Sequence, residues 1–321
     1  MKKPLNINFV KNSKTLAIIS ACILVVGLIF SFIFPVDLDI SFKGGTQVKF
    51  SYTGDLDKAG LKETVEEMLG KKVEMKDAYT YDGSEKLSTA TFYLTENLDS
   101  EITDKMEKTV IEKYKDFELT HISTNSLSPT MGQMFFIKCL VAVGLAALLL
   151  LIYVAFRFRK IGGLSAGLFG IFALINDMLI AYLAFVVFRI PLNDNFVAVM
   201  LSVLGYSLND TIVIFDRVRE NRRLSDEKTP ISDIVNKSVN QSFVRTMNTS
   251  ITTVLAIGTV TVLAFATGMD AIISFALPMT FGVLSGFYSS VFLCTPLWGK
   301  WVEHKEKREA EKKALKKGKK K

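Results

Sequence analysis

The chain has 321 residues, of which 49% are hydrophobic, and a formal net charge of +7. These overall figures match an average globular protein and by themselves exclude no class of protein. The order of the residues does exclude a soluble protein, because long apolar runs with few charges occupy residues 15–36, 139–156, 161–188, 196–209, 246–269 and 271–299.

Each run is predicted to be a transmembrane helix, because about 20 helical residues cross ~30 Å of hydrocarbon. The first run is too long for the apolar core of a cleaved signal peptide, and no small-residue cleavage site follows it. Lysine and arginine gather before the first run, in the second-to-third and fourth-to-fifth connections, and after the last run. Both termini are therefore predicted to be cytosolic.

The predicted organisation is a cytosolic N-terminus (1–14), a first transmembrane helix (15–36), an external domain (37–130), a five-helix transmembrane region (131–299) and a basic cytosolic tail (300–321). The lysine-rich run 312–321 at the end of the tail is too charged to bury anything, so we expect it to be disordered and to lie against anionic lipid, with a ribosomal RNA contact as the alternative. The three cysteines, Cys22, Cys139 and Cys294, all lie in predicted spans, and no disulfide framework is expected.

The external domain has 12 lysines against 19 carboxylates, a net charge of −7. Strand-like alternation and helical periodicity follow one another in it in the order β-α-β-β-α-β. That order predicts a ferredoxin-like domain, in which two helices cover one face of a four-stranded antiparallel sheet. The open face would suit an extended polypeptide segment, and docking to a membrane partner alone is the alternative. His121 has no nearby Cys or second His, so we expect it to be structural and no metal ligand.

The predicted fold is therefore an α-helical polytopic membrane protein, with six transmembrane helices and one α+β ferredoxin-like external domain between the first and second spans. Two aspartates, Asp177 and Asp210, fall inside predicted spans. A carboxylate in a span is costly and is by default a functional hypothesis, with a hydrogen-bonded structural role as the alternative. Counted from the cytosolic side at ~1.5 Å per residue, Asp177 lies ~20 Å deep and Asp210 ~8 Å deep. The ~12 Å offset argues against an intramembrane aspartyl protease, whose two carboxylates share a proton at contact distance.

Polar residues are predicted to form one stripe on each of two neighbouring spans, Ser202, Tyr206, Asn209 and Asp210 on the fourth and Arg245, Thr249, Thr252 and Thr253 on the fifth. We expect these stripes to share a hydrated seam in which Asp210 pairs with Arg245. The paired carboxylate would stay ionised, and a carboxylate separated from Arg245 in a dry seam would take up a proton. The pair is thus a predicted proton switch, and sodium is the alternative ion.

Two glycine patterns in the spans have competing interpretations. Gly163-Leu-Ser165-Ala-Gly167 fits the nucleophile pattern G-x-S-x-G, but no histidine lies in any predicted span. We therefore favour close helix packing through the glycines, and likewise for Gly282-x-x-x-Gly286. No nucleotide-binding or zinc-protease pattern is present in the sequence, so no enzyme activity, cofactor or metal is expected.

The stretch Val203-Leu-Gly-Tyr-Ser-Leu-Asn-Asp-Thr-Ile-Val-Ile-Phe-Asp-Arg-Val-Arg-Glu-Asn221 resembles the signature of the SecF-type members of the SecD/SecF family of protein-export membrane proteins. Residues 237–250 resemble the next family block, and Phe42-Lys-Gly-Gly-Thr46 resembles the glycine motif after the first span. The resemblance extends from about residue 10 to residue 300. The signature residues carried over are Gly205, Tyr206, Ser207, Asn209, Asp210, Thr211, Asp216, Arg217, Arg219, Glu220 and Asn221.

The resemblance implies membership of the resistance-nodulation-division superfamily, whose members couple proton entry to movements of large external domains. It implies a SecD-like partner, a SecYEG-type channel, an unfolded preprotein as substrate and contact with membrane lipids, with no nucleic acid. It assigns the proton pathway to Asp210 and Arg245, to which we add Asp177, Asn209, Tyr206 and Thr249. Asp177 matches a family aspartate that usually follows a histidine, and Asn176 replaces that histidine here.

The implied function is protein translocation across the cytoplasmic (inner) membrane, driven by the proton-motive force. A proton-coupled exporter half-subunit for lipids or small molecules is the alternative of a different class, and a scaffold for a partner is a third. Gly44 and Gly45 are predicted to form a flexible joint between the membrane and the external domain, with a tight turn as the alternative.

Overall fold

The computed structural model describes residues 7–82, 85–96, 98–226 and 229–318. Within these residues six helical segments are long and apolar enough to cross a membrane: α1 (Phe9–Ile33), α5 (Pro129–Arg157), α6 (Gly163–Val187), α7 (Asp194–Leu224), α8 (Ile231–Thr267) and the segment Asp270–Lys312. The last segment combines α9 (Asp270–Tyr288), a π-helical turn (Ser289–Cys294) and most of α10 (Thr295–Gly318).

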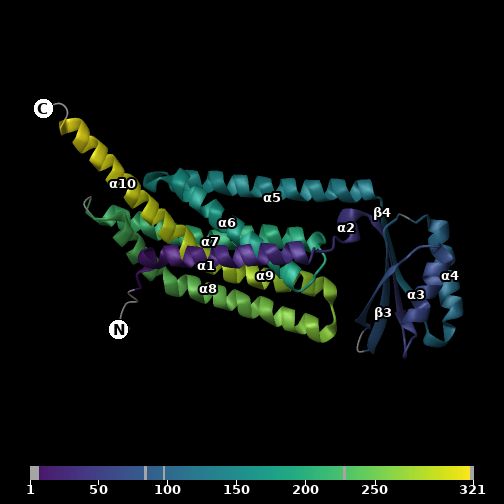
Figure 1. Cartoon of the computed structure of the whole chain (residues 1–321). Coiled ribbons are helices and arrows are strands. Elements are labelled where there is room, and N and C mark those ends of the chain that lie inside the picture. Colours follow the sequence, from purple (N-terminus) through teal and green to yellow (C-terminus); the bar gives the residue numbers. More distant parts are fainter. Residues whose placement is uncertain (1–6, 83–84, 97, 227–228, 319–321) are drawn as a thin grey trace.

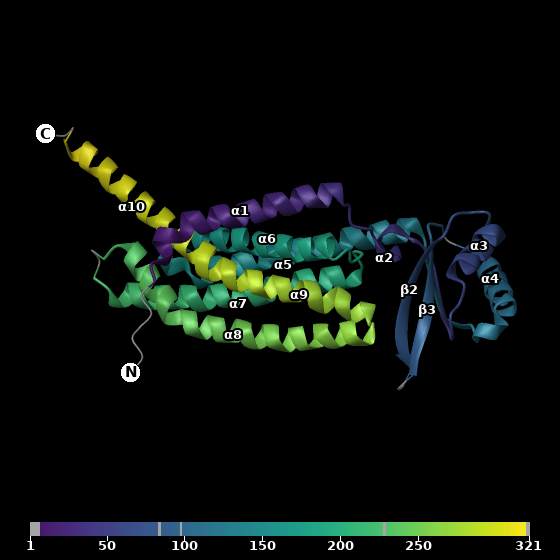
Figure 2. The same ribbon diagram turned by 60° about the horizontal axis from the view of Figure 1, so that its bottom comes forward.

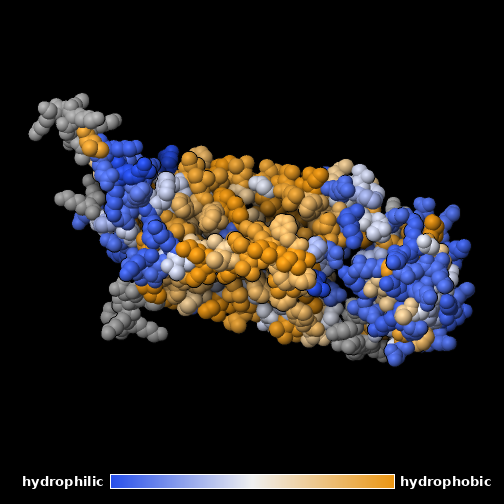
Figure 3. Space-filling model, in the orientation of Figure 1, coloured by the Kyte–Doolittle hydropathy of each residue, from blue (hydrophilic) through white to orange (hydrophobic). Residues whose placement is uncertain are grey.

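The helices form an elongated bundle with a small sheet domain at one end, and α10 protrudes from the other end (Figure 1, Figure 2). We call the end away from the sheet the distal end. The beginning of α1 also lies there. In the face shown in Figure 3, a continuous apolar surface covers the middle of the bundle, and hydrophilic residues cover the sheet domain and the distal end. This is the surface pattern expected of a bundle surrounded by hydrocarbon at its middle.

Burial within the bundle is uneven. About half of the residues are buried in the most apolar stretches of α6 and α7, 56% and 50%, against 6% in α1, 11% in α5 and 17% in α8. The weakly buried helices expose large apolar side chains such as Phe32, Leu149 and Leu255. The interior in which a polar group is shielded from lipid therefore lies around α6, α7 and α9.

Helices continue beyond the apolar runs at the distal end. α10 extends to Gly318, so the expected disorder of the lysine-rich run is wrong for residues 312–318. The tail is rich in Lys and Glu, which are strong helix formers. An ion pair of 2.7 Å between Glu303 and Lys307, four residues apart, adds to helix stability. Residues 319–321 lie outside the described residues.

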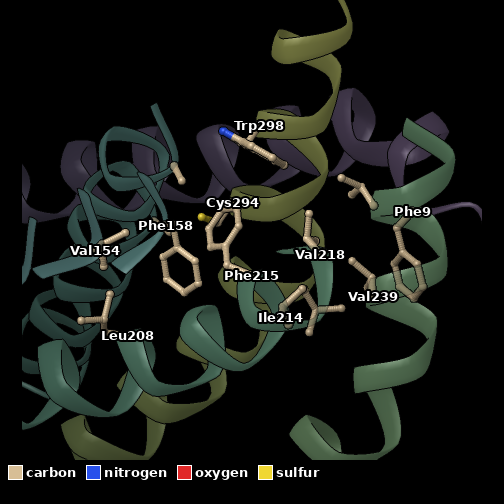
Figure 4. Close-up of a cluster of buried hydrophobic side chains, with 14 of the residues drawn as sticks. Phe9, Val154, Phe158, Leu208, Ile214, Phe215, Val218, Val239, Cys294 and Trp298 are labelled. Carbon is tan, nitrogen blue, oxygen red and sulfur yellow. The ribbon is translucent and has the colours of Figure 1, made fainter. Parts of the chain in front are cut away.

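Aromatic side chains from different helices meet in the core of the distal end (Figure 4). The ring of Phe215 on α7 lies 5.6 Å from that of Phe158, which follows α5, and 5.2 Å from that of Trp298 on α10. Trp298 is fully buried, and its indole N–H donates a hydrogen bond of 3.1 Å to Ser165 Oγ on α6. These contacts hold α5, α6, α7 and α10 together at the distal end of the bundle.

Close helix contacts at glycines confirm the packing interpretation of both glycine patterns. A Cβ atom added to Gly163 would lie 2.1 Å from the carbonyl oxygen of Ala155 on α5, and one added to Gly282 would lie 2.3 Å from Val203 on α7. Real Cβ atoms do not approach so closely, so a larger residue at either position would push the helices apart. The glycines therefore set the spacing of α6 against α5 and of α9 against α7.

The sheet domain has the predicted order of elements and an antiparallel sheet with strand order β2-β3-β1-β4. Its elements are α2 (Ile40–Lys43), β1 (Gly45–Tyr52), α3 (Lys58–Leu69), β2 (Glu74–Asp82), β3 (Glu85–Leu94), α4 (Ser100–Lys113) and β4 (Thr120–Leu127). Short 3-10 helices, Lys115–Phe117 and Arg159–Ile161, precede β4 and α6. Helices α3 and α4 lie on one side of the sheet (Figure 2). The other side faces away from both helices.

The two faces of β1 differ in chemistry. Val48 and Phe50 are fully buried in the core that the sheet shares with α3 and α4. Because side chains alternate along a strand, Gln47 and Lys49 point to the opposite face, where both are half-buried. Gln47 Nε2 donates there to the Tyr93 hydroxyl at 3.2 Å. The face away from the helices is therefore polar, with a tyrosine ring in it.

Gly44 and Gly45 lie where α2 joins β1, and both have positive φ, 77° and 126°. A Cβ atom on Gly44 would lie 2.4 Å from the Cα of Pro129, which begins α5, and one on Gly45 would lie 2.2 Å from the carbonyl oxygen of Leu94. The backbone conformation and the close contacts both require glycine in this conformation. Movement at this joint stays a prediction.

Candidate functional site

Asp177 lies in the interior of the bundle, on α6, with no exposed surface. Its Oδ1 accepts from Ser285 Oγ at 2.6 Å and from Asn176 Nδ2 at 3.2 Å. Its Oδ2 accepts from Ser207 Oγ at 2.5 Å and from Ser289 Oγ at 2.7 Å. No lysine or arginine in the described part of the chain forms an ion pair with it. We call these five residues the Asp177 centre. It satisfies a buried carboxylate by hydrogen bonds alone.

Further hydrogen bonds connect the Asp177 centre to its surroundings. Ser20 Oγ on α1 donates to Asn176 Oδ1 at 2.6 Å. The hydroxyls of Thr211 on α7 and Ser290 lie 2.8 Å apart, and Ser290 Oγ donates to the carbonyl oxygen of Ser207 at 3.3 Å. One polar network therefore joins α1, α6, α7, α9 and the π-helical turn in the interior of the bundle.

The π-helical turn Ser289–Cys294 places two consecutive serines in this network. In an α-helix neighbouring residues point about 100° apart, so they seldom face the same interior. Here Ser289 and Ser290 are both fully buried, and they contact Asp177 and Thr211 respectively. π-Helical turns are rare and often occur at functional sites. The turn therefore has a direct part in building the site.

Asp210 is 2% exposed on α7 and accepts a hydrogen bond of 3.3 Å from Ser250 Oγ on α8. Ser207, which binds Asp177, precedes it by three residues, a rise of about 4.5 Å along the helix. The two carboxylates thus lie roughly one turn apart along α7. The expected ~12 Å offset is wrong because it assumed equal entry depth and equal tilt for both helices. No hydrogen bond joins the two carboxylates in the described structure.

The expected ion pair between Asp210 and Arg245 is not formed in this structure. Arg245 is exposed, forms no ion pair within the described residues, and lines a cavity at the distal end. Ser250 faces Asp210 instead. It lies five residues farther along α8, about 7.5 Å on and about 140° around the helix. Arg245 therefore belongs to a different face of α8 from the one that meets Asp210.

Of the other predicted pathway residues, Tyr206 joins α7 to α8 by a hydrogen bond, and Thr249 and Asn209 do not do so among the residues that the structure describes. The Tyr206 hydroxyl donates to Thr253 Oγ1 at 3.1 Å. Thr249 Oγ1 donates within its own helix to the carbonyl oxygen of Arg245 at 3.0 Å, and Asn209 is exposed. The predicted seam thus consists of the Tyr206 and Asp210 contacts to α8, while the larger polar network contacts Ser207 and Thr211 on an adjacent face of α7.

The second half of the signature joins α7 to its neighbours at the distal end. Asp216 pairs with Arg157 of α5 at 3.0 Å and with Arg219 at 2.9 Å. The remaining contacts are Arg217 to Glu220 at 2.6 Å, Arg217 to Gln241 at 2.7 Å, and Asn221 to Ser238 at 2.8 Å and to Gln241 at 2.9 Å. Gly205 is exposed, with open space where a Cβ would lie.

Sequence reasoning missed Ser285, Ser289, Ser290 and Ser20 as site residues. A signal for the first two was present, because a spacing of four places Ser285 and Ser289 on one helix face within an otherwise apolar run. In the external domain, His121 Nε2 lies 3.0 Å from Glu107 Oε1, and its ring packs on Phe50. The described residues contain no group of three side chains suited to hold a metal.

Comparison with known proteins shows which protein family the chain resembles. The family model of the C-terminal region of the protein export membrane proteins SecD/SecF matches residues 106–304. A protein translocase subunit SecF from Alicyclobacillus acidocaldarius is 30% identical over 294 residues, which cover 92% of each chain. A second one, from Sebaldella termitidis, is 30% identical and covers 91% of each chain.

Longer relatives are matched over part of their length. The protein translocase subunit SecDF of Bacillus subtilis is 30% identical over 94% of this chain, which spans 39% of that protein. A crystal structure of a Thermus SecDF, described as translocon-associated, superposes with a TM-score of 0.75 at 24% identity, over 92% of this chain and 39% of that one. This structural likeness shows a shared fold.

Proposed function

Because the chain belongs to the SecD/SecF family of protein export membrane proteins, we propose that it uses the proton-motive force to promote protein translocation across the cytoplasmic membrane. It is a SecF-type translocase subunit, and the work of such a subunit is conformational rather than enzymatic. The substrate would be an unfolded preprotein. The observation that carries the proposal is the pair of buried carboxylates, Asp177 and Asp210, about one turn apart in the bundle.

The proposed partner is a SecD-type subunit. The chain spans about two fifths of the relatives named SecDF, so a SecD-type portion would account for much of the remainder. α8 and α1 expose long apolar faces that a second set of helices would cover. A SecYEG-type channel is the further partner that a role in translocation requires.

The proposed orientation has the distal end in the cytosol. Basic residues gather at that end, in residues 157–160, 217–223 and 300–318, and positive charge favours the cytosolic side. The sheet domain would then lie outside the cytoplasm as the ferredoxin-like domain inferred from its order of elements. Its polar open face would bind the emerging chain and prevent it from sliding back.

The proposed proton path runs through Asp177 and Asp210. A proton on Asp177 would turn one acceptor oxygen into a donor, so one of its four donors would have to turn away. Ser289 has a second acceptor, the carbonyl oxygen of Gly286 at 3.2 Å, available for this. Protonation would thereby loosen the hold of α6 on the π-helical turn. Pairing of Asp210 with Arg245 would belong to another conformation of the cycle.

The energy available matches such a step. Moving one charge across the membrane yields ~2.3 kcal/mol per 100 mV. Typical coupling free energies between sites are about 1–3 kcal/mol. One proton per cycle would therefore suffice to bias a small movement of α9 against α6.

The test uses vesicles that contain this chain together with its SecD-type partner and the channel. Asp177→Asn and Asp210→Asn should each abolish the stimulation of preprotein transport by a proton gradient, while the amount of folded protein stays unchanged. Asp270→Asn, which neutralises an exposed carboxylate at the sheet end of α9, is the matched control and should keep the stimulation. Full stimulation in both buried variants would place the proton path elsewhere.

An exporter of lipids or small molecules, built on the same half-assembly, is the second candidate. Co-purification from native membranes separates the two functions. A SecD-type protein and channel subunits in the complex support translocation, whereas an unrelated export partner supports the alternative.

A further inference from the structure

A cavity of about 930 Å³ opens at the distal end between the 3-10 helix Arg159–Ile161, which precedes α6, and the facing parts of α7 and α8. Six of its lining residues are basic and two are acidic, which gives the lining a net charge of +4. A cavity with so strong a positive charge concentrates anions. Whether the cavity binds an anion therefore depends on which of the six basic residues are not already paired with a carboxylate of the protein.

Ion pairs within the protein use part of this charge. Arg219 pairs with Asp216, and Arg217 pairs with Glu220. Arg222 lies 3.7 Å from Glu306 on α10. These pairs account for both acidic lining residues.

Three cations remain. Lys160, Arg223 and Arg245 line the cavity from three different elements, and none of them has an ion pair in the part of the chain that the structure describes. All three are exposed. Cations that line one cavity without protein carboxylates to pair with suit a phosphate group, since guanidinium and ammonium groups donate charge-assisted hydrogen bonds to phosphate oxygens.

The position of the cavity indicates the source of the phosphate. Arg245 directly precedes the uncharged run 246–269 of α8, and Arg217 comes two residues after Phe215 in α7. The cavity thus lies where both helices leave the apolar part of the bundle, at the level of lipid headgroups. Ile161 and Val213 add apolar surface to its lining. A basic pocket of this kind between helices suits an anionic headgroup.

We propose that this cavity binds the phosphodiester headgroup of an anionic phospholipid through Lys160, Arg223 and Arg245. The bound lipid would bridge α7 and α8 at the distal end. This site is separate from the Asp177 centre, and it shares only Arg245 with the proposed proton path.

The test measures lipid binding to the purified full-length chain in neutral detergent by native mass spectrometry, with phosphatidylglycerol and phosphatidylcholine as probes. The wild type should retain phosphatidylglycerol in preference to phosphatidylcholine. The double variant Lys160→Gln/Arg223→Gln should lower the affinity for phosphatidylglycerol about 30-fold, since each basic residue near an anionic lipid contributes roughly a fivefold factor. Arg245 is left intact because it belongs to the proposed proton path.

The matched control is Arg308→Gln/Lys312→Gln, which removes the same charge from α10 outside the cavity and should leave the affinity nearly unchanged. An equal loss of affinity for phosphatidylglycerol in the two double variants would show an effect of general surface charge and would contradict the proposed site. Displacement of the lipid by millimolar inorganic phosphate would identify a site for a soluble anion instead, and would overturn the assignment to lipid.

Discussion

Replacing Ser289 by alanine tests whether the Asp177 centre is held by hydrogen bonds to a charged acceptor. The substitution removes the 2.7 Å bond from Ser289 Oγ to Asp177 Oδ2 and leaves three donors on the carboxylate. A hydrogen bond to a charged group contributes about 1.5–3 kcal/mol, against about 0.5–1.5 kcal/mol for a neutral pair. Ser289→Ala should therefore lower the free energy of unfolding by about 1.5–3 kcal/mol in the wild-type background.

The same substitution in an Asp177→Asn background should cost about 0.5–1.5 kcal/mol, because the charged acceptor is gone. Ser290→Ala is the matched control. Ser290 is equally buried in the same π-helical turn but contacts the neutral Thr211 hydroxyl, so its cost should be alike in both backgrounds. Unfolding is followed by denaturant titration of the purified chain in detergent. An equal cost of Ser289→Ala in the two backgrounds would refute a charged hydrogen bond between Ser289 and Asp177.

Three further predictions concern packing and surface. Gly282→Ala should destabilise the bundle by about 1–3 kcal/mol, because the added Cβ would lie 2.3 Å from Val203. The control is Gly258→Ala in α8, which should be neutral or stabilising because a Cβ there meets nothing within 4 Å. Thermal melts of the two variants measure the difference. Gly44→Ala should raise the rate of proteolysis between the bundle and the sheet domain more than Gly70→Ala does. Both glycines have positive φ, but only a Cβ on Gly44 would meet Pro129. Equal rates for the two variants would mean that backbone strain is the sole effect. A photo-crosslinker at Lys49 should capture a stalled preprotein, and one at the buried Val48 should not. If the crosslinker at Lys49 captures membrane partners alone, the sheet domain is a docking surface for those partners.

Much of the architecture follows from the sequence because it depends on local pattern. The six apolar helices follow from runs of uncharged residues, and the order of elements in the sheet domain follows from alternation and helical periodicity. The tail shows the limit of composition, since its lysine-rich end, although too charged to bury anything, still forms a helix as far as Gly318 through intrinsic propensity.

The site was predicted only in part, because it depends on how the helices are rotated and tilted. Asp177 and Asp210 are recognisable from charge alone, since a carboxylate in an apolar run has few interpretations. Their hydrogen-bond partners are not recognisable from the sequence. Which of Arg245 and Ser250 meets Asp210 depends on the depth and rotation of α8, and the apolar run gives neither. Ser289 and Ser290 both face the interior only because the helix changes to a π-turn, for which the sequence has no known signal.

The polar network also links the interior to the sheet domain through α1. The first turn of this helix is held in the core, where Phe9 and Val10 are buried, whereas no residue of α1 beyond Ser20 is buried. Its polar ties include the bond from Ser20 to Asn176, the neighbour and hydrogen-bond donor of Asp177, and the 2.7 Å contact of Ser31 with the Tyr182 hydroxyl. The Tyr288 hydroxyl also donates to the carbonyl oxygen of Leu16 at 2.8 Å. α1 continues into α2 and the tightly packed Gly44, which begins the sheet domain. Because Asn176 binds both Ser20 and Asp177, a change in the hydrogen bonds of the carboxylate reaches α1 through a single side chain. The part of α1 beyond Ser20, in which no residue is buried, is therefore the part of the helix that a small change of about 1–3 kcal/mol is able to shift.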